Sequence, residues 1–87
     1  MKVYNMTSAK GNQIANQFEI YDKKGKYFQS YNSTIVFINK KGQVYLDEYY
    51  WDYSTTTGKY RNIFLGEKKK ETENKIKNKI YKLKNLN

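Results

Sequence analysis

The chain has 87 residues, which suits a single domain over residues 1–87 and leaves no room for a second hydrophobic core. It contains no Cys and no His, so disulfide bonds and the usual structural zinc sites are excluded, and packing alone has to build the core. Seventeen Lys and Arg against eight Asp and Glu give a formal net charge of +9, which favours a polyanionic partner such as nucleic acid.

The basic composition also has an explanation without function. Sixteen of the 17 basic residues are Lys, and Asn and Tyr occur ten times each, all of which an AT-rich coding sequence favours. If the charge is functional, the excess of Lys predicts phosphate contacts that do not depend on nucleotide sequence. Base recognition instead favours the two-pronged guanidinium of Arg.

The first half of the chain predicts antiparallel strands. Residues 14–21 alternate in polarity, with Ile14, Phe18 and Ile20 on one face, which is typical of a half-buried strand. The segments 22–25 and 39–42 each combine an acidic or amide residue, two lysines and a glycine, and each predicts a hairpin with a left-handed glycine. Together with a central turn at 31–33, they predict a four-stranded meander over residues 14–47. Residues 3–6 are compatible with an extra edge strand.

After residue 47 the pattern changes to helix. Ser54 and Thr55 are suitable N-cap residues for a short helix, and Gly66 marks its end. The residues expected to share its apolar face are Tyr60, Ile63 and Phe64. A second helix is expected over about residues 69–79, followed by an extended segment at 81–83. The predicted fold class is α+β: a small antiparallel sheet covered by one or two C-terminal helices.

The residue types argue against catalysis. Without His and Cys, the commonest general base and the most reactive nucleophile are missing, and no glycine-rich phosphate loop is present. Asp47, Glu48 and Asp52 could hold Mg²⁺ beside Lys59, but acidic residues at a strand end are more often solvated turn residues. We therefore expect a protein that is not an enzyme and that uses no metal or cofactor.

Four aromatic side chains crowd into residues 49–53 and are the first candidates for partner binding. In an extended segment Trp51 and Tyr53 would point one way and Tyr50 the other, so that one set packs into the core and leaves the other available. Available rings suit stacking on bases or a protein interface. The alternative is that all of these rings serve only to build a core in a chain without disulfides.

Candidate cationic contacts lie in three places. Lys59 and Arg61 follow the hydroxyl side chains of residues 54–57, which suit either a phosphate or plain helix capping. The two lysine-bearing turns should lie at the same end of a meander, and the second helix carries lysines beside its apolar stripe. The full set is Lys23, Lys24, Lys40, Lys41, Lys59, Arg61, Lys75 and Lys79. A solvated surface position is the alternative for each.

Residues 30–36 (SYNSTIV), 51–60 (WDYSTTTGKY) and 64–65 (FL) resemble a family of small domains of unknown function from phages and mobile elements of low-GC bacteria. The resemblance covers about residues 13–87. It implies an origin rather than an activity, since no catalytic residues carry over. It also implies a second class of function, because many small phage proteins inhibit host defence complexes, as anti-CRISPR proteins do.

We therefore expect a non-catalytic, phage-type protein that binds nucleic acid or a nucleoprotein complex through lysine and aromatic side chains. The alternative is an inhibitor that docks on a host defence protein or its guide-RNA complex. The longest apolar run, residues 35–38, is far too short for a signal sequence or a spanning helix. We expect a cytoplasmic chain without a membrane partner.

Overall fold

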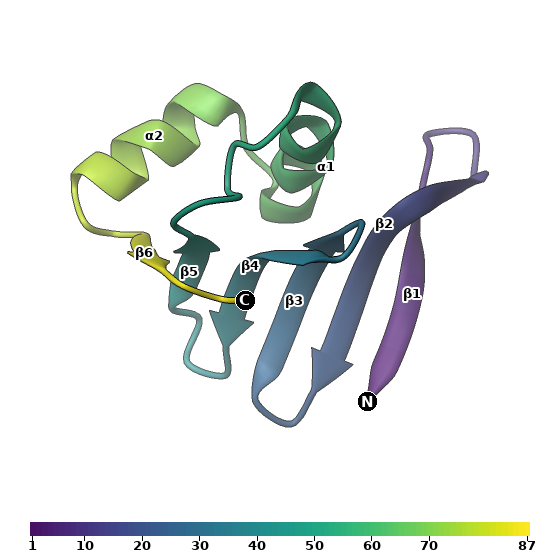
Figure 1. Cartoon of the computed structure of the whole chain (residues 1–87), viewed down its shortest axis with the longest axis horizontal. Coiled ribbons are helices and arrows are strands. Elements are labelled where there is room, and N and C mark those ends of the chain that lie inside the picture. Colours follow the sequence, from purple (N-terminus) through teal and green to yellow (C-terminus); the bar gives the residue numbers. More distant parts are fainter.

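The computed structural model, which describes residues 1–87, contains one six-stranded sheet and two helices. The strands are β1 (Lys2–Thr7), β2 (Gln13–Asp22), β3 (Gly25–Ser30), β4 (Ser33–Asn39), β5 (Val44–Asp47) and β6 (Lys82–Lys84), and they lie side by side in chain order. Strands β1 to β5 form an antiparallel meander, and β6 pairs with β5 in parallel. The helices, α1 (Thr55–Leu65) and α2 (Lys69–Lys77), both cover one face of the sheet (Figure 1).

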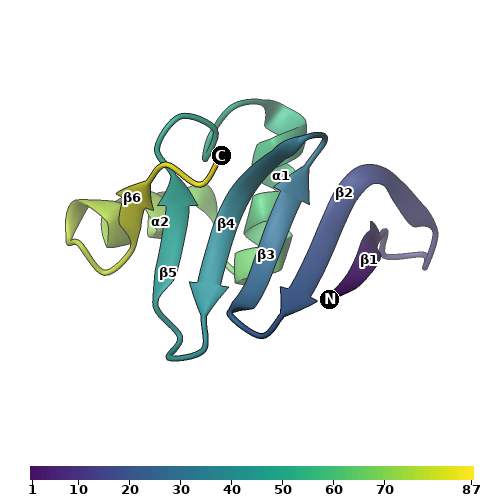
Figure 2. The ribbon, with the colours of Figure 1, turned by 60° about the horizontal axis from the view of Figure 1, so that its bottom comes forward.

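The opposite face of the sheet carries no helix (Figure 2). Only the C-terminal tail crosses it, at the start of β4 and the end of β5. There the side chain of Asn87 donates to the carbonyl oxygen of Thr34 at 3.0 Å and accepts from the amide of Thr34 at 2.8 Å. The structure therefore has a covered face and an open face, and this asymmetry defines where a partner has access.

The α+β class and the meander are confirmed, but the sheet is larger than the four predicted strands. The possible edge strand at residues 3–6 is present as β1, and the extended segment near residue 82 is present as β6. Helix α2 ends at Lys77, two residues earlier than predicted, and Lys79 adopts a left-handed backbone with φ of 60°. Lys75 and Lys79 therefore do not share a helical face.

The two lysine-bearing turns use the same side-chain chemistry with different lengths. Asp22 accepts from the amides of Lys24 (2.8 Å) and Gly25 (3.2 Å), and Asn39 accepts from the amides of Lys41 and Gln43 at 3.0 Å each. The first loop has two residues between paired positions, and the second is longer. Gly25 is required by contact: a Cβ there would lie 2.1 Å from the carbonyl oxygen of Ile38.

Helix α1 begins and ends where the sequence predicts. The Ser54 hydroxyl accepts from the amide of Thr57 at 3.1 Å, and Gly66, with φ of 70°, closes the last turn. Its inward face differs from the predicted one, because Ile63 is exposed. The residues that face the sheet or the core follow the i, i+3, i+4, i+7 pattern: Thr57, Tyr60, Arg61 and Phe64. Neither helix has the length and apolar composition needed to cross a membrane.

The space between sheet and helices is unusually polar. Seven buried apolar side chains form the core: Met6, Phe28, Ile35, Val36, Leu46, Tyr60 and Tyr81. Six buried residues are polar or charged: Gln17, Ser30, Asp47, Thr57, Arg61 and Thr72. A shift in the β3–β4 register lets two consecutive residues of β4 enter the core. The small apolar core leaves many large apolar side chains to lie elsewhere.

Strand β2 shows most directly that polar side chains are buried while apolar side chains lie on the open face. Gln17 is fully buried on the helix side, and neither of its side-chain amide atoms has a hydrogen-bond partner. Phe18 and Ile20, predicted to face the core, lie on the open face instead. Their cross-strand partners are Gln29 and Tyr27, the two neighbours of the buried Phe28, and these point away from the core. The predicted orientation is therefore wrong for Phe18 and Ile20, while Ile14 packs against the core as expected.

Candidate functional site

A continuous row of large side chains crosses the open face of the sheet. Residues paired directly across antiparallel strands point to the same face, so the register of the sheet fixes the members of this row. In strand order they are Val3, Ile20, Tyr27, Phe37, Tyr45 and Lys82. The row thus carries one residue from each of the six strands, and we call it the cross-strand row.

The aromatic rings of the cross-strand row stack on one another. The ring centroids of Tyr27 and Phe37 are 4.7 Å apart with 21° between the planes, and those of Phe37 and Tyr45 are 6.0 Å apart with 17°. The Nζ atom of Lys84 lies 5.4 Å from the centroid of the Tyr45 ring. All three rings are partly exposed. The row is therefore an apolar ladder with a cationic end on β6.

Two carboxylates lie on the strands of the open face. Asp22 and Asp47 are the acidic strand residues of the open face, and backbone amides engage both. Burial alone would raise the pKa of Asp47, but hydrogen bonds from the amides of Leu86 and Tyr50, among others, hold this pKa below its usual value. Burial, together with the Asp22 carboxylate, raises the pKa of Tyr27, so its phenol stays protonated.

The hairpin lysines form a basic end next to the cross-strand row. The β2–β3 and β4–β5 turns lie at the same end of the sheet (Figure 1), as the meander predicts, and Lys23, Lys24, Lys40 and Lys41 are all exposed. Tyr27 is two residues from the start of β3, which places the row about 7 Å from the turn at a rise of about 3.3 Å per residue. Exposed positive charge and stacked aromatic rings are thus adjacent.

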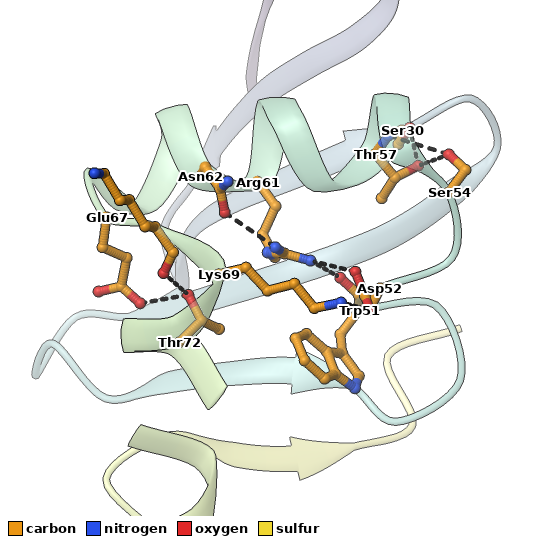
Figure 3. A network of polar contacts seen from close by, with 11 residues as sticks. Ser30, Trp51, Asp52, Ser54, Thr57, Arg61, Asn62, Glu67, Lys69 and Thr72 are labelled. Atoms are coloured by element: carbon orange, nitrogen blue, oxygen red, sulfur yellow. Dashed lines mark hydrogen bonds and ion pairs between the residues drawn. The ribbon is translucent and has the colours of Figure 1, made fainter. Parts of the chain in front are cut away.

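Arg61, predicted as a partner contact, is instead an internal residue (Figure 3). Its side chain is 1% exposed, and one terminal nitrogen donates to the carbonyl oxygen of Trp51 at 2.7 Å and to Asp52 at 3.2 Å. The other donates to the Asn62 side chain at 3.0 Å, and the guanidinium lies 5.2 Å from the Trp51 ring centroid. This side chain ties α1 to the segment before it and is not available to a partner.

The hollow beside Arg61, where the sequence suggests either a phosphate site or helix capping, contains a carboxylate as well as cations. This hollow of about 770 Å³ lies at the start of α1, and the Asp52 carboxylate is part of its wall. Lys69 pairs with the second oxygen of Asp52 at 2.7 Å. Burial would raise the pKa of Asp52, but Lys69 and Arg61 hold it below its usual value. The Ser54 hydroxyl is occupied in capping. Asp52 thus pairs with two of the three cations that line the hollow, Arg61 and Lys69, while Lys59 forms no ion pair.

The aromatic segment at residues 49–53 is a turn rather than an extended strand, which corrects the predicted alternation. The Asp47 carboxylate accepts from the amides of Tyr49 (3.0 Å) and Tyr50 (2.8 Å), and this bends the chain. Tyr50 and Trp51 pack against the core, while Tyr53 is 65% exposed. Tyr50 makes edge-to-face contacts with both exposed neighbours.

The remaining cationic candidates are dispersed. Lys59 is exposed on α1, with its Nζ 5.5 Å from the Tyr60 ring centroid. Lys75 is engaged with Glu67 at 2.7 Å. Lys79 lies in the loop after α2. Of the predicted cationic contacts, only the four hairpin lysines lie together at one end of the sheet.

Sequence reasoning missed the cross-strand row. Its signal was present: Tyr27, Phe37 and Tyr45 fall on one face once the hairpin register is known. The alternation of residues 14–21 predicts one buried face, but Phe18 and Ile20 of that strand lie on the open face.

A family model described as a family of unknown function (DUF8033) matches residues 1–82. No curated protein and no solved structure shows significant similarity to the chain.

Proposed function

The chain belongs to the DUF8033 family, whose function is unknown, and we propose that it is a non-catalytic protein that binds single-stranded nucleic acid on the open face of its sheet. The observation that carries this proposal is the cross-strand row of stacked aromatic rings beside four exposed hairpin lysines. Bases contact the rings, and phosphates follow the lysines.

The geometry of the row limits how a base lies. Neighbouring rings already cover part of each ring face, so a base rests across the row rather than between two rings. From Tyr27 to Tyr45 the row spans two strand spacings, or about 10 Å, which is enough for about two or three bases. Antiparallel sheets with aromatic side chains on a helix-free face are a recurrent platform for single strands. That precedent is an analogy of surface chemistry.

The charge favours nucleic acid over a neutral partner. The hairpin tips provide Lys23, Lys24, Lys40 and Lys41, and β6 adds Lys82 and Lys84 at the far end of the row. With Arg61 internal, the face has no guanidinium to read base edges. Binding is therefore independent of nucleotide sequence and strongly dependent on salt. DNA and RNA share the chemistry that this face recognises.

The test is the salt dependence of binding to fluorescein-labelled oligothymidylate and oligouridylate, measured by anisotropy. Four phosphate contacts predict a slope of about −3 in log K against log salt, since a single strand contributes about −0.7 per contact. A variant with Lys23, Lys24, Lys40 and Lys41 changed to Gln should lose most of that slope. The matched control changes Lys10, Lys68, Lys70 and Lys77, which are equally exposed and carry the same charge.

The control variant should keep the binding and nearly the full slope of the unmodified protein. Equal losses in the two variants would mean that only the overall charge matters, and the proposed face would be wrong. A protein partner is the second candidate, because exposed aromatic rings also serve as hot spots. It predicts no measurable binding to either oligonucleotide at low salt, and that result would overturn the nucleic-acid proposal.

A further inference from the structure

We propose a second binding site, for an uncharged proline-rich segment in the polyproline II conformation, at the end of the sheet opposite the hairpin lysines. The site is a pocket of about 440 Å³ between the β3–β4 turn and the start of α1. Three tyrosines, Tyr31, Tyr50 and Tyr53, line it. This volume lies within the range of about 300–1,000 Å³ that is typical of ligand pockets.

Tyr31 is held in a conformation that its residue type disfavours. Its φ is 55°, in the left-handed region where Gly and Asn are the suitable residues. The turn fixes this backbone, because the amide of Tyr31 donates to the carbonyl oxygen of Asn16 at 2.7 Å. The Gln29 side chain donates to the carbonyl oxygen of Tyr31 at 2.9 Å.

The ring of Tyr31 adds little packing that would offset this backbone strain. Its side chain is 54% exposed and does not belong to the core. Tyr53, on the other wall of the pocket, is exposed as well, and it is held by an edge contact with Tyr50 at 5.3 Å between centroids. The pocket therefore combines two exposed rings, Tyr31 and Tyr53, with the Tyr50 ring, which packs against the core. Such an arrangement is suited to contact with another molecule.

The lining of the pocket combines rings with neutral donors. It contains no charged residue in a chain with a net charge of +9. Its polar members are Ser30, Asn32, Ser33, Ser54 and Thr57. Ser30, Ser54 and Thr57 bond to one another, with Ser30 Oγ and Thr57 Oγ1 at 3.0 Å. The Asn32 amide and the three phenol hydroxyls have no partner within the chain and are free to donate.

A polyproline II segment matches this lining in both respects. Prolyl rings are apolar and fit between aromatic side chains, and the backbone carbonyl oxygens of this helix are not used internally, so that they accept from phenol and amide donors. Proline has no amide hydrogen, so the segment asks for no acceptor. A phosphodiester strand would instead require cations, which the pocket lacks. The uncharged lining selects the proline-rich peptide.

The test is a titration of ¹⁵N-labelled protein with decaproline to millimolar concentration, followed by NMR. We expect shifts in residues 30–33 and 50–57, and none with a Gly-Ser peptide of equal length. Tyr31→Asn should weaken binding about tenfold while the melting temperature stays equal or rises, because Asn accepts the left-handed backbone. Tyr53→Ala should also weaken it. Tyr4→Ala is the matched control, since Tyr4 is 50% exposed and lies outside the pocket.

Three results would overturn the proposal: no shifts with decaproline, equal shifts with the Gly-Ser peptide, or an equal loss in Tyr4→Ala. Shifts of the same residues with oligothymidylate would assign the pocket to the nucleic-acid surface instead. The hairpin-lysine variant should bind decaproline normally, so this site stands or fails separately from the proposed function.

Discussion

The ring of Phe37 lies parallel to the ring of Tyr27, with centroids 4.7 Å apart, in the middle of a sheet face that no helix covers. The same sheet buries Gln17 on its other face with both amide atoms unpaired. A domain organised only for stability would exchange these positions, since apolar area gains free energy on burial and an unpaired amide loses it. The observed arrangement, with the rings on the open face and the amide in the core, has a physical reason if a partner covers the rings.

Phe37→Leu tests whether the stacking surface contributes to binding. Leucine keeps most of the apolar contact, so we expect a stability loss below about 1.5 kcal/mol. Removing one ring should weaken binding of a single strand about tenfold, since base stacking contributes about 1–3 kcal/mol per base. Tyr4→Leu is the control: Tyr4 lies on the opposite face of β1 and is half exposed. Equal affinities of the two variants would exclude the row as the contact surface.

Gly58→Ala should stabilise the protein. Gly58 lies inside α1, where glycine costs about 0.5–1 kcal/mol relative to alanine, and a Cβ would meet Arg61 and Asp52 at 3.7 Å, an ordinary contact. Urea denaturation should show a gain of about that size. Gly25→Ala serves as the contrast, because its Cβ would collide with the Ile38 carbonyl oxygen and should destabilise strongly. A loss of stability in Gly58→Ala would mean that the side chains of Arg61 and Asp52 cannot accommodate the added methyl group.

Arg61→Lys should lower the free energy of unfolding by about 2–3 kcal/mol, because a lysine cannot reach Trp51, Asp52 and Asn62 with one buried head group. Lys59→Gln changes an exposed cation two residues earlier in the same helix and should change stability by less than about 0.5 kcal/mol. Thermal and urea unfolding followed by circular dichroism distinguish the two. An Arg61→Lys variant as stable as the unmodified protein would contradict the internal role of this guanidinium.

The stability should fall in acid, and Asp47 should contribute to the fall. Hydrogen bonds hold the pKa of Asp47 below its ordinary value of 3.8 despite burial, so the folded state favours the charged carboxylate. Its stabilisation is complete above about pH 5 and is lost as the pH falls through the lowered pKa. Asp52 and Glu67 behave in the same direction, because burial, which would raise their pKa values, is outweighed by their ion pairs.

Asp47→Asn isolates that contribution. The variant should be less stable at neutral pH by about 1–3 kcal/mol, since an amide cannot replace the carboxylate that accepts from Tyr50 and Leu86. Its stability should also vary less between about pH 5 and pH 2 than that of the unmodified protein. Parallel acid dependence in both proteins would show that Asp47 is not the titrating group.

Local signals in the sequence predicted the local structure. The Asp22 and Asn39 turns, the Ser54 cap and the Gly66 stop each depend on contacts within about four residues, and all are present. The meander followed from them, because short turns leave adjacent strands no other pairing.

Long-range contacts determined what the sequence could not predict. Arg61 looks like any surface cation until Trp51 and Asp52 surround it, and the bend at residues 48–53 depends on Asp47, whose other oxygen is held by the C-terminal tail. The face that the helices cover differs from the predicted one at Phe18 and Ile20, which lie on the other side of β2. Hydrophobic alternation gives the two faces of a strand, but it cannot say which one the helices cover.

The most direct test of the account is an NMR titration of the ¹⁵N-labelled protein with an oligothymidylate of about 12 nucleotides at low salt. The account predicts shifts centred on Ile20, Tyr27, Phe37 and Tyr45 and on both hairpin tips, reversed by added salt. Shifts confined to α1 and α2, or no shifts at low salt, would contradict the claim that the open face of the sheet is the binding surface.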